Sequence, residues 1–145
     1  MNIALFAELK DNEIITPLNI EYVSSIECKY GIKLPESYVN LLKEQNGGYI
    51  TRSIIPEYIN DITVTRLSGI KGNNDDVLEE SDYYINEWDL PKNILLLAGQ
   101  GHWWICLDYR DINDNDEPRV SYIDSEMKRD LVIADSFEEF IKILV

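Results

Sequence analysis

Two aspartates, Asp108 and Asp124, form the one pair of side chains for which the sequence suggests chemistry. Each stands at the end of a stretch whose pattern predicts a β-strand, and we expect the two strands to be neighbours. Two carboxylates brought together would bind a cation or raise the pKa of one of them. The structural alternative is that both cap strand ends or pair with nearby basic residues. The candidates for such pairing are Arg110, Arg119 and Lys128.

Other motifs resemble catalytic or metal sites only in part. Gly99-Gln100-Gly101 lacks the third glycine of a phosphate-binding loop and leads into a predicted strand, so we interpret it as a hairpin turn. His102 is the only histidine, which excludes a site with several histidine ligands. Residues 111–116 begin like a calcium loop, but Asp116 replaces the required glycine and Tyr122 the final glutamate. None of these partial motifs predicts catalytic residues, a metal site or a cofactor.

Acidic side chains dominate the charge of the chain. The chain has 27 acidic and 13 basic residues, and its formal net charge is −14. This charge disfavours nucleic acid and anionic membranes as partners and favours a basic protein, although surplus acid also keeps proteins soluble. Residues 72–91 carry no Lys or Arg and form the most negative region, while a second acidic loop runs from Arg110 to Pro118.

The length of 145 residues fits one domain, 1–145, with a single core. Cys28 and Cys106 are expected to be small buried residues of a reducing compartment and not a disulfide pair. The N-terminus shows no signal peptide. The longest apolar run, Ile94–Ala98, is far shorter than the roughly 20 residues that span a bilayer. We therefore expect a soluble, cytoplasmic protein.

Helices are predicted in the N-terminal third and at the end of the chain. Apolar residues at every third position predict a short helix over 3–9. Asn19 is expected to cap a second helix that Gly31 ends. Pro35 starts a third helix, and Asn46-Gly47-Gly48 ends it, so the two form a helical hairpin. A capping box, in which Ser136 is followed three residues later by Glu139, starts the last helix.

Between these helices the apolar period changes from helix to strand. Strands are predicted at 49–51, 62–67, 94–98, 102–109 and 119–124. The continuous apolar run 94–98 is expected in the middle of a sheet that is covered on both faces. Trp88, Trp103 and Trp104 are expected to pack in the core. The sum is an α+β fold, a curved antiparallel sheet with an N-terminal helical hairpin and a C-terminal helix packed on it.

A set of motifs in a fixed order extends over nearly the whole chain. The motif residues are Leu34, Pro35, Tyr38, Leu41, Asn46, Gly47, Gly48, Gly99, Gly101, Trp104, Asp108, Tyr122, Ile123, Asp124, Ser136, Phe137 and Phe140. In order and spacing they resemble the SUKH superfamily, which includes yeast cell-wall-synthesis regulators and many bacterial immunity proteins. The region 50–91 contains no motif of this set.

The resemblance implies an α+β SUKH fold, no enzymatic activity, and binding to a protein toxin, often a nuclease, that is thereby neutralised. An acidic protein suits that role, because nuclease clefts are basic. We hypothesise that carboxylates of the two acidic regions form the contact surface. These are Asp75, Asp76, Glu79, Glu80, Asp82, Asp111, Asp114, Asp116 and Glu117. The alternatives are a non-enzymatic scaffold for a cellular protein and an enzyme that uses Asp108 and Asp124 with a metal.

Overall fold

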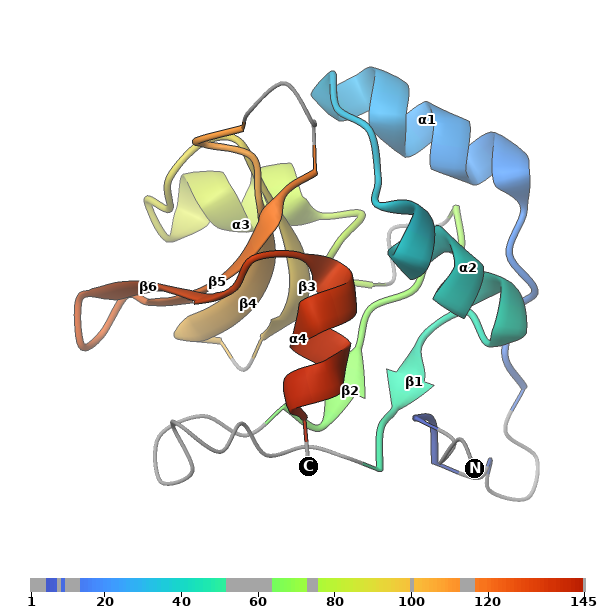
Figure 1. Ribbon diagram of the computed structural model, residues 1–145. Coiled ribbons are helices and arrows are strands. Elements are labelled where there is room, and N and C mark those ends of the chain that lie inside the picture. The colour runs from blue at the N-terminus through green and yellow to red at the C-terminus, as the bar shows by residue number, and fades with distance from the viewer. Residues whose placement is uncertain are drawn as a thin grey trace.

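The computed structural model describes residues 5–7, 9, 14–51, 64–72, 76–99, 101–112 and 117–144 (Figure 1). Its helices are α1 (Ile20–Tyr30), α2 (Glu36–Glu44), α3 (Ser81–Glu87) and α4 (Phe137–Ile143). Its strands are β1 (Gly48–Tyr49), β2 (Arg66–Leu67), β3 (Ile94–Gly99), β4 (Trp103–Asp108), β5 (Arg119–Asp124) and β6 (Arg129–Ala134). The predicted α+β class is confirmed. In the described part of the chain, no helix has the length and apolar character needed to cross a membrane.

Four antiparallel strands in the order β3-β4-β5-β6 form the main sheet. Side chains alternate between its faces, so one face of β4 contributes Ile105 and Leu107 to the larger core while the other contributes Trp104 and Cys106 to a second core. The larger core lies under α4, and Tyr84 and Ile85 of α3 pack against the second core. Figure 1 shows α4 and α3 on opposite faces of this sheet.

The apolar strand β3 lies at an edge of the sheet, so its predicted central position was wrong. It is buried on both faces as expected, and its outer edge is covered as well. The N–H of Ser68 donates to the carbonyl of Leu97 at 2.7 Å, and the N–H of Leu96 donates to Ser81 Oγ at 2.9 Å. These contacts use edge groups that would otherwise be open to pairing with another chain. The opposite edge is β6, a half-exposed strand that the sequence analysis did not predict.

Three of the four predicted end signals of the helical hairpin are confirmed, but α2 ends at Glu44 with an extended Gln45 and not at Asn46-Gly47-Gly48. Asn19 Oδ1 accepts a hydrogen bond from the N–H of Glu21 at 2.9 Å, and Gly31 ends α1 in the left-handed conformation with φ 65°. Pro35 stands directly before the first residue of α2. The ring of Tyr38 lies edge-on to Phe137 of α4, with ring centres 5.1 Å apart. This contact joins the hairpin to the C-terminal helix.

The predicted N-terminal helix is contradicted at residues 5–7. Phe6 forms an antiparallel bridge with Ile50, the N–H of Ala7 donates to the carbonyl of Tyr49, and the N–H of Thr51 donates to the carbonyl of Leu5. The segment is therefore extended along β1. A helix this short has little stability of its own. Pairing with β1 instead satisfies its backbone groups, and Leu5 is buried in the core.

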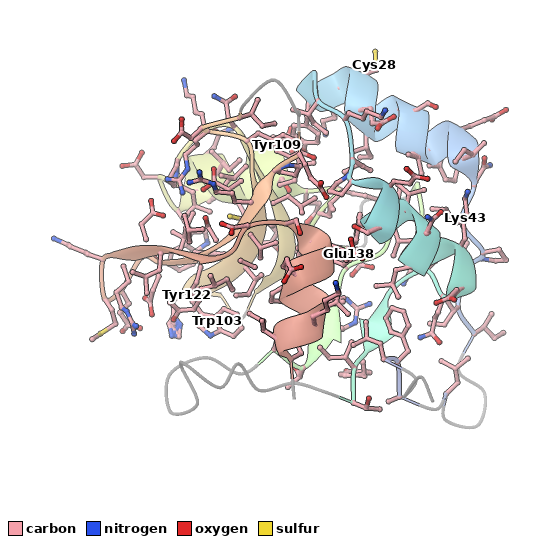
Figure 2. All side chains as sticks on the ribbon, in the orientation of Figure 1. Cys28, Lys43, Trp103, Tyr109, Tyr122 and Glu138 are labelled. Carbon is pink, nitrogen blue, oxygen red and sulfur yellow. The ribbon has the colours of Figure 1, made fainter. Side chains whose placement is uncertain are left out.

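One of the two cysteines also departs from expectation. Cys106 is buried on β4, as predicted, but Cys28 is exposed on the outer side of α1 (Figure 2). The buried residues of α1 are Val23 and Ile26, and Cys28 lies two residues after Ile26, off that stripe. Burial raises the pKa of the Cys106 thiol.

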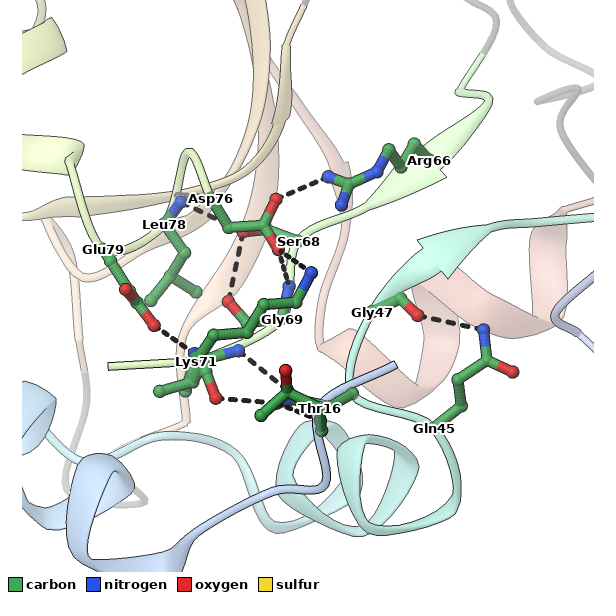
Figure 3. Close-up of polar contacts among 12 residues, drawn as sticks. Thr16, Gln45, Gly47, Arg66, Ser68, Gly69, Lys71, Asp76, Leu78 and Glu79 are labelled. Atoms are coloured by element: carbon green, nitrogen blue, oxygen red, sulfur yellow. Dashed lines mark hydrogen bonds and ion pairs between the residues drawn. The ribbon is translucent and has the colours of Figure 1, made fainter. Parts of the chain in front are cut away.

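A buried polar cluster holds the end of α2 against the segment that follows β2 (Figure 3). The side chain of Asn46 donates to the carbonyl of Thr16 at 3.0 Å and to that of Ile70 at 2.7 Å, and it accepts from the N–H of Ile70 at 2.8 Å. Asn46 is only 1% exposed. A side chain at Gly69 would clash with the backbone carbonyl of Asn46, so the close approach requires glycine. We call Asn46, Ser68, Ile70, Asp76 and Glu79 the Asn46 cluster.

We expect Asn46→Ala to lower the free energy of unfolding by about 2–4 kcal/mol, because it leaves buried backbone groups of Ile70 without partners. Urea unfolding should show a lower midpoint with an unchanged slope. The matched control is Asn40→Ala on the exposed side of α2, for which we expect a change within about 0.5 kcal/mol. Equal midpoints for the two variants would contradict the role assigned to Asn46.

Candidate functional site

Two of the nine carboxylates proposed as a contact surface are internal. Asp76 is 3% exposed and Glu79 is 2% exposed. Asp76 pairs with Arg66 and with Lys71 Nζ at 3.6 Å, and it accepts from the N–H of Gly69 at 3.0 Å. Glu79 accepts from the backbone N–H of Lys71 (Figure 3) and also from the backbone N–H of Gly72. These two carboxylates bind the turn before α3 to the segment after β2, so they are not available to a partner.

The remaining carboxylates divide into exposed residues and residues outside the described part of the chain. Asp82, Asp111 and Glu117 are exposed, and Glu80 is partly exposed. Asp75, Asp114 and Asp116 lie outside the described residues, as does most of the segment that begins like a calcium loop.

One exposed carboxylate from each acidic region lines a surface hollow, and a third hollow lies between these two. Three adjoining hollows follow the connection between α1 and α2, and neighbouring hollows share lining residues. The hollow next to α3 and the middle hollow share Tyr30, Ile32, Asn93 and Tyr109. The middle hollow shares Lys33 with the third hollow, which lies next to the start of α2. We call these five residues and the hollows that they line the connection groove. Asp82 lines the hollow at one end, Glu117 lines the hollow at the other, and Asp111 precedes Ile112, which lines the middle.

The floor of the connection groove is fixed by two hydrogen bonds of Tyr109. Its hydroxyl donates to the carbonyl of Lys33 at 2.8 Å, and its N–H donates to the carbonyl of Asn93 at 2.9 Å. Tyr109 is 8% exposed, and burial raises the pKa of its hydroxyl. Figure 2 shows Tyr109 at the end of the sheet nearest the C-terminal end of α1. The end of β4 and the hairpin therefore form one surface.

At the α3 end of the groove, Asp82 contacts both Tyr30 and Lys29. The Tyr30 hydroxyl lies 3.2 Å from Asp82 Oδ1 and also 3.2 Å from the N–H of Asp82, from which it accepts. Lys29 Nζ lies 3.5 Å from Asp82 Oδ2 and 5.1 Å from the centre of the Tyr30 ring. Burial raises the pKa of Asp82, but the Lys29 charge and the hydrogen bonds outweigh it and lower this pKa overall. Asp82 is therefore anionic at neutral pH.

Comparison with known protein families identifies the family of this chain. The sequence model of the SMI1/KNR4 family (SUKH-1) matches residues 17–143. The chain belongs to this family. Domains of the SUKH-1 family are generally non-enzymatic and bind partner proteins, among them toxins. A comparison with curated proteins finds no match.

Most SUKH-1 motif residues named from the sequence are structural. They are buried in the cores or at the contact between α2 and the segment after β2: Leu34, Pro35, Tyr38, Asn46, Gly47, Gly48, Trp104, Phe137 and Phe140. Leu41 is partly buried against the larger core. Ser136 caps α4 by accepting from the N–H of Glu139 at 3.1 Å, and Gly101, with φ 97°, lies in the turn between β3 and β4. The hairpin-turn interpretation of Gly99 and Gly101 is therefore confirmed.

The predicted approach of Asp108 to Asp124 is wrong. Since β4 and β5 are antiparallel, Asp108 lies opposite Arg119 and Asp124 lies opposite Trp103, which places the two carboxylates at opposite ends of the strand pair. No paired-carboxylate site exists there. In the described part of this SUKH-1 chain, no three His, Cys, Asp or Glu side chains lie close enough together to hold a metal ion.

Each of the two aspartates instead has the structural role given as the alternative. Asp108 accepts two side-chain hydrogen bonds from Arg110, at 2.9 and 2.8 Å, and one from Ser121 at 2.7 Å. Arg110 also pairs with Asp130 of β6. Asp124 accepts from the N–H groups of Glu126 and Met127 and closes the turn between β5 and β6.

Sequence reasoning missed the residues that form the connection groove. Tyr30 is the last residue of α1, Asn93 directly precedes β3, and Tyr109 directly follows β4. Asn93 has a left-handed backbone with φ 64°, which Asn adopts more readily than most residues. No local pattern connects these positions, because the fold alone brings them together.

The contacts of Asp108 predict a pH-dependent contribution to stability. Burial raises the pKa of Asp108, but hydrogen bonds from Arg110 and Ser121 outweigh it and lower this pKa overall. The ionised carboxylate therefore stabilises the fold above its unfolded pKa, about 3.9, and this contribution is lost as pH falls through the lower folded value. We expect Asp108→Asn to cost about 1–3 kcal/mol at pH 7, with a smaller difference from the unaltered chain below pH 3.

The measurement is urea unfolding of both proteins between pH 7 and pH 2. Asp89→Asn is the matched control, because Asp89 is exposed and its left-handed backbone, with φ 51°, accepts Asn. We expect this control to differ little from the unaltered chain at any pH. A cost of Asp108→Asn that stays constant across this range would show that the charge of Asp108 contributes nothing.

Proposed function

We propose that this SUKH-1 chain is an immunity protein that binds a protein toxin of the nuclease type and neutralises it by covering the basic cleft of that toxin. The family includes toxin immunity proteins. The net charge of −14 favours a basic partner. The observation that carries the proposal is that exposed carboxylates from both acidic regions border the same groove.

The proposed contact surface combines charge with apolar and aromatic area. Asp82, Asp111 and Glu117 would take the place of nucleic-acid phosphates against the cations of the toxin. Exposed ion pairs contribute only about 0.2–1 kcal/mol each, so most of the affinity must come from buried contacts. The tyrosines and isoleucines along the connection groove supply such contacts, and aromatic anchors of this kind commonly dominate binding energy. The charges mainly accelerate association.

The first test is co-expression with a toxin domain encoded by a neighbouring gene, if such a gene is found, with cell survival as the readout. Binding is then measured in vitro across a salt series. We expect rescue, and an affinity that falls steeply as salt rises. Absence of both rescue and binding would contradict the immunity function and favour the alternative of a scaffold for a cellular protein.

A pair of triple variants tests the contact surface. Asp82→Lys, Asp111→Lys and Glu117→Lys together should weaken toxin binding by about 100-fold at low salt, because three favourable contacts become repulsive. The control combines Glu44→Lys, Glu126→Lys and Asp135→Lys, which change the net charge equally at exposed positions that do not line the groove. Rescue that survives the first triple variant as well as the control would keep the immunity function and refute the groove as its contact surface.

A further inference from the structure

The hollow at the α3 end of the connection groove has the dimensions of a side-chain pocket. Its volume is 190 Å³, below the range of about 300–1,000 Å³ that is usual for sites of whole small-molecule ligands. Ile85, Ile94 and Leu95 supply apolar lining, and Asp82, Asn86 and Asn93 supply polar lining. A long side chain with an aliphatic stem and a charged end matches this combination.

The pocket has one group that binds a cation, the carboxylate of Asp82, which already pairs with Lys29. The carboxylate of Asp82 is held anionic by its hydrogen bonds and by Lys29, whose ammonium also lies over the Tyr30 ring. This corner of the molecule thus already binds one cation between a carboxylate and an aromatic ring. The side chains of Lys29 and Asp82 are 45% and 55% exposed, so their ion pair is weak and Asp82 can accept a second or a replacing cation at little cost. Lys92 also lines the hollow, but it is exposed and its ammonium can remain in solvent.

The pocket favours arginine over lysine. Besides the carboxylate of Asp82, it carries the amide groups of Asn86 and Asn93, whose oxygens can accept hydrogen bonds. A guanidinium presents five N–H donors in a plane and can use several acceptors at once, whereas an ammonium is a point charge. Tyr30 and Tyr109 also line the hollow, and a guanidinium stacks on aromatic rings.

We propose that this pocket, formed by Tyr30, Asp82, Asn86, Asn93 and Tyr109, receives one arginine side chain of the partner protein. The inference rests on the proposed function, because it assigns one position of the contact surface to one residue type of the toxin. The arginine enters with its stem along the apolar lining and its guanidinium at Asp82.

The pocket can be tested without the toxin. N-acetyl-arginine amide is titrated into the ¹⁵N-labelled protein, and binding is followed by NMR chemical shifts. We expect saturable shifts confined to residues around the hollow. N-acetyl-citrulline amide, which has the same shape without the charge, should bind at least about fivefold more weakly. Asp82→Asn should weaken binding of the arginine probe by a similar factor, whereas Asp89→Asn, at an exposed position outside the lining, should leave it unchanged.

Three results of this titration would overturn the inference: no shifts at the solubility limit of the probe, equal binding of the citrulline analogue, or shifts spread over every acidic surface. The NMR spectrum of each variant shows directly whether it is folded. Toxin binding by Asp82→Asn separates this inference from the proposed function. If Asp82→Asn keeps full affinity for the toxin, the arginine pocket is overturned and the immunity function stays intact. If Asp82→Asn loses affinity for the toxin and Asp89→Asn does not, both the pocket and the immunity function are supported.

Discussion

The hydrogen bonds of the buried Asn46 amide determine how the two parts of this fold meet. They join the end of α2 to the backbone of Ile70, and the same short segment contacts α2 again through the Tyr38 hydroxyl, which donates to the carbonyl of Ser68 at 2.6 Å. The N–H of Ser68 in turn covers the edge of β3. One segment therefore binds the helical hairpin on one side and the main sheet on the other. Buried polar groups without these partners would destabilise both contacts.

The position of the connection groove depends on the same cluster. Glu79 is held by the backbone of Lys71 and Gly72, and α3 begins two residues after it, which fixes the location of Asp82. The carbonyl of Glu79 also lies 3.4 Å from the Tyr30 hydroxyl at the end of α1. The exposed carboxylate is thus placed by internal contacts that a partner would never touch. The position of the Asp82 carboxylate on the surface therefore depends on the buried contacts of Glu79.

Local signals in the sequence predicted most elements, and their failures share one cause. Asn19, Gly31 and Ser136 act on the nearest few residues, so the helix ends that they mark are confirmed. The extended course of residues 5–7, the edge position of β3 and the separation of Asp108 from Asp124 depend on which distant segments pair. The burial of Asp76 and Glu79 has the same origin, because their partners lie up to ten residues earlier, in β2 and in the segment that follows it. Periodicity carries no information about such pairing.

The two groups of carboxylates in this chain differ in what a substitution would disturb. Asp76 and Glu79 are enclosed by the backbone that they support, whereas Asp111 and Glu117 are exposed between β4 and β5, outside the Asn46 cluster. Descendants of this sequence can therefore acquire or lose charge along the groove while the core remains intact. In these two groups, the exposed charges and the buried folding contacts belong to different residues. If the groove is the contact surface proposed above, its charge can change to match a new partner without any change in the interior.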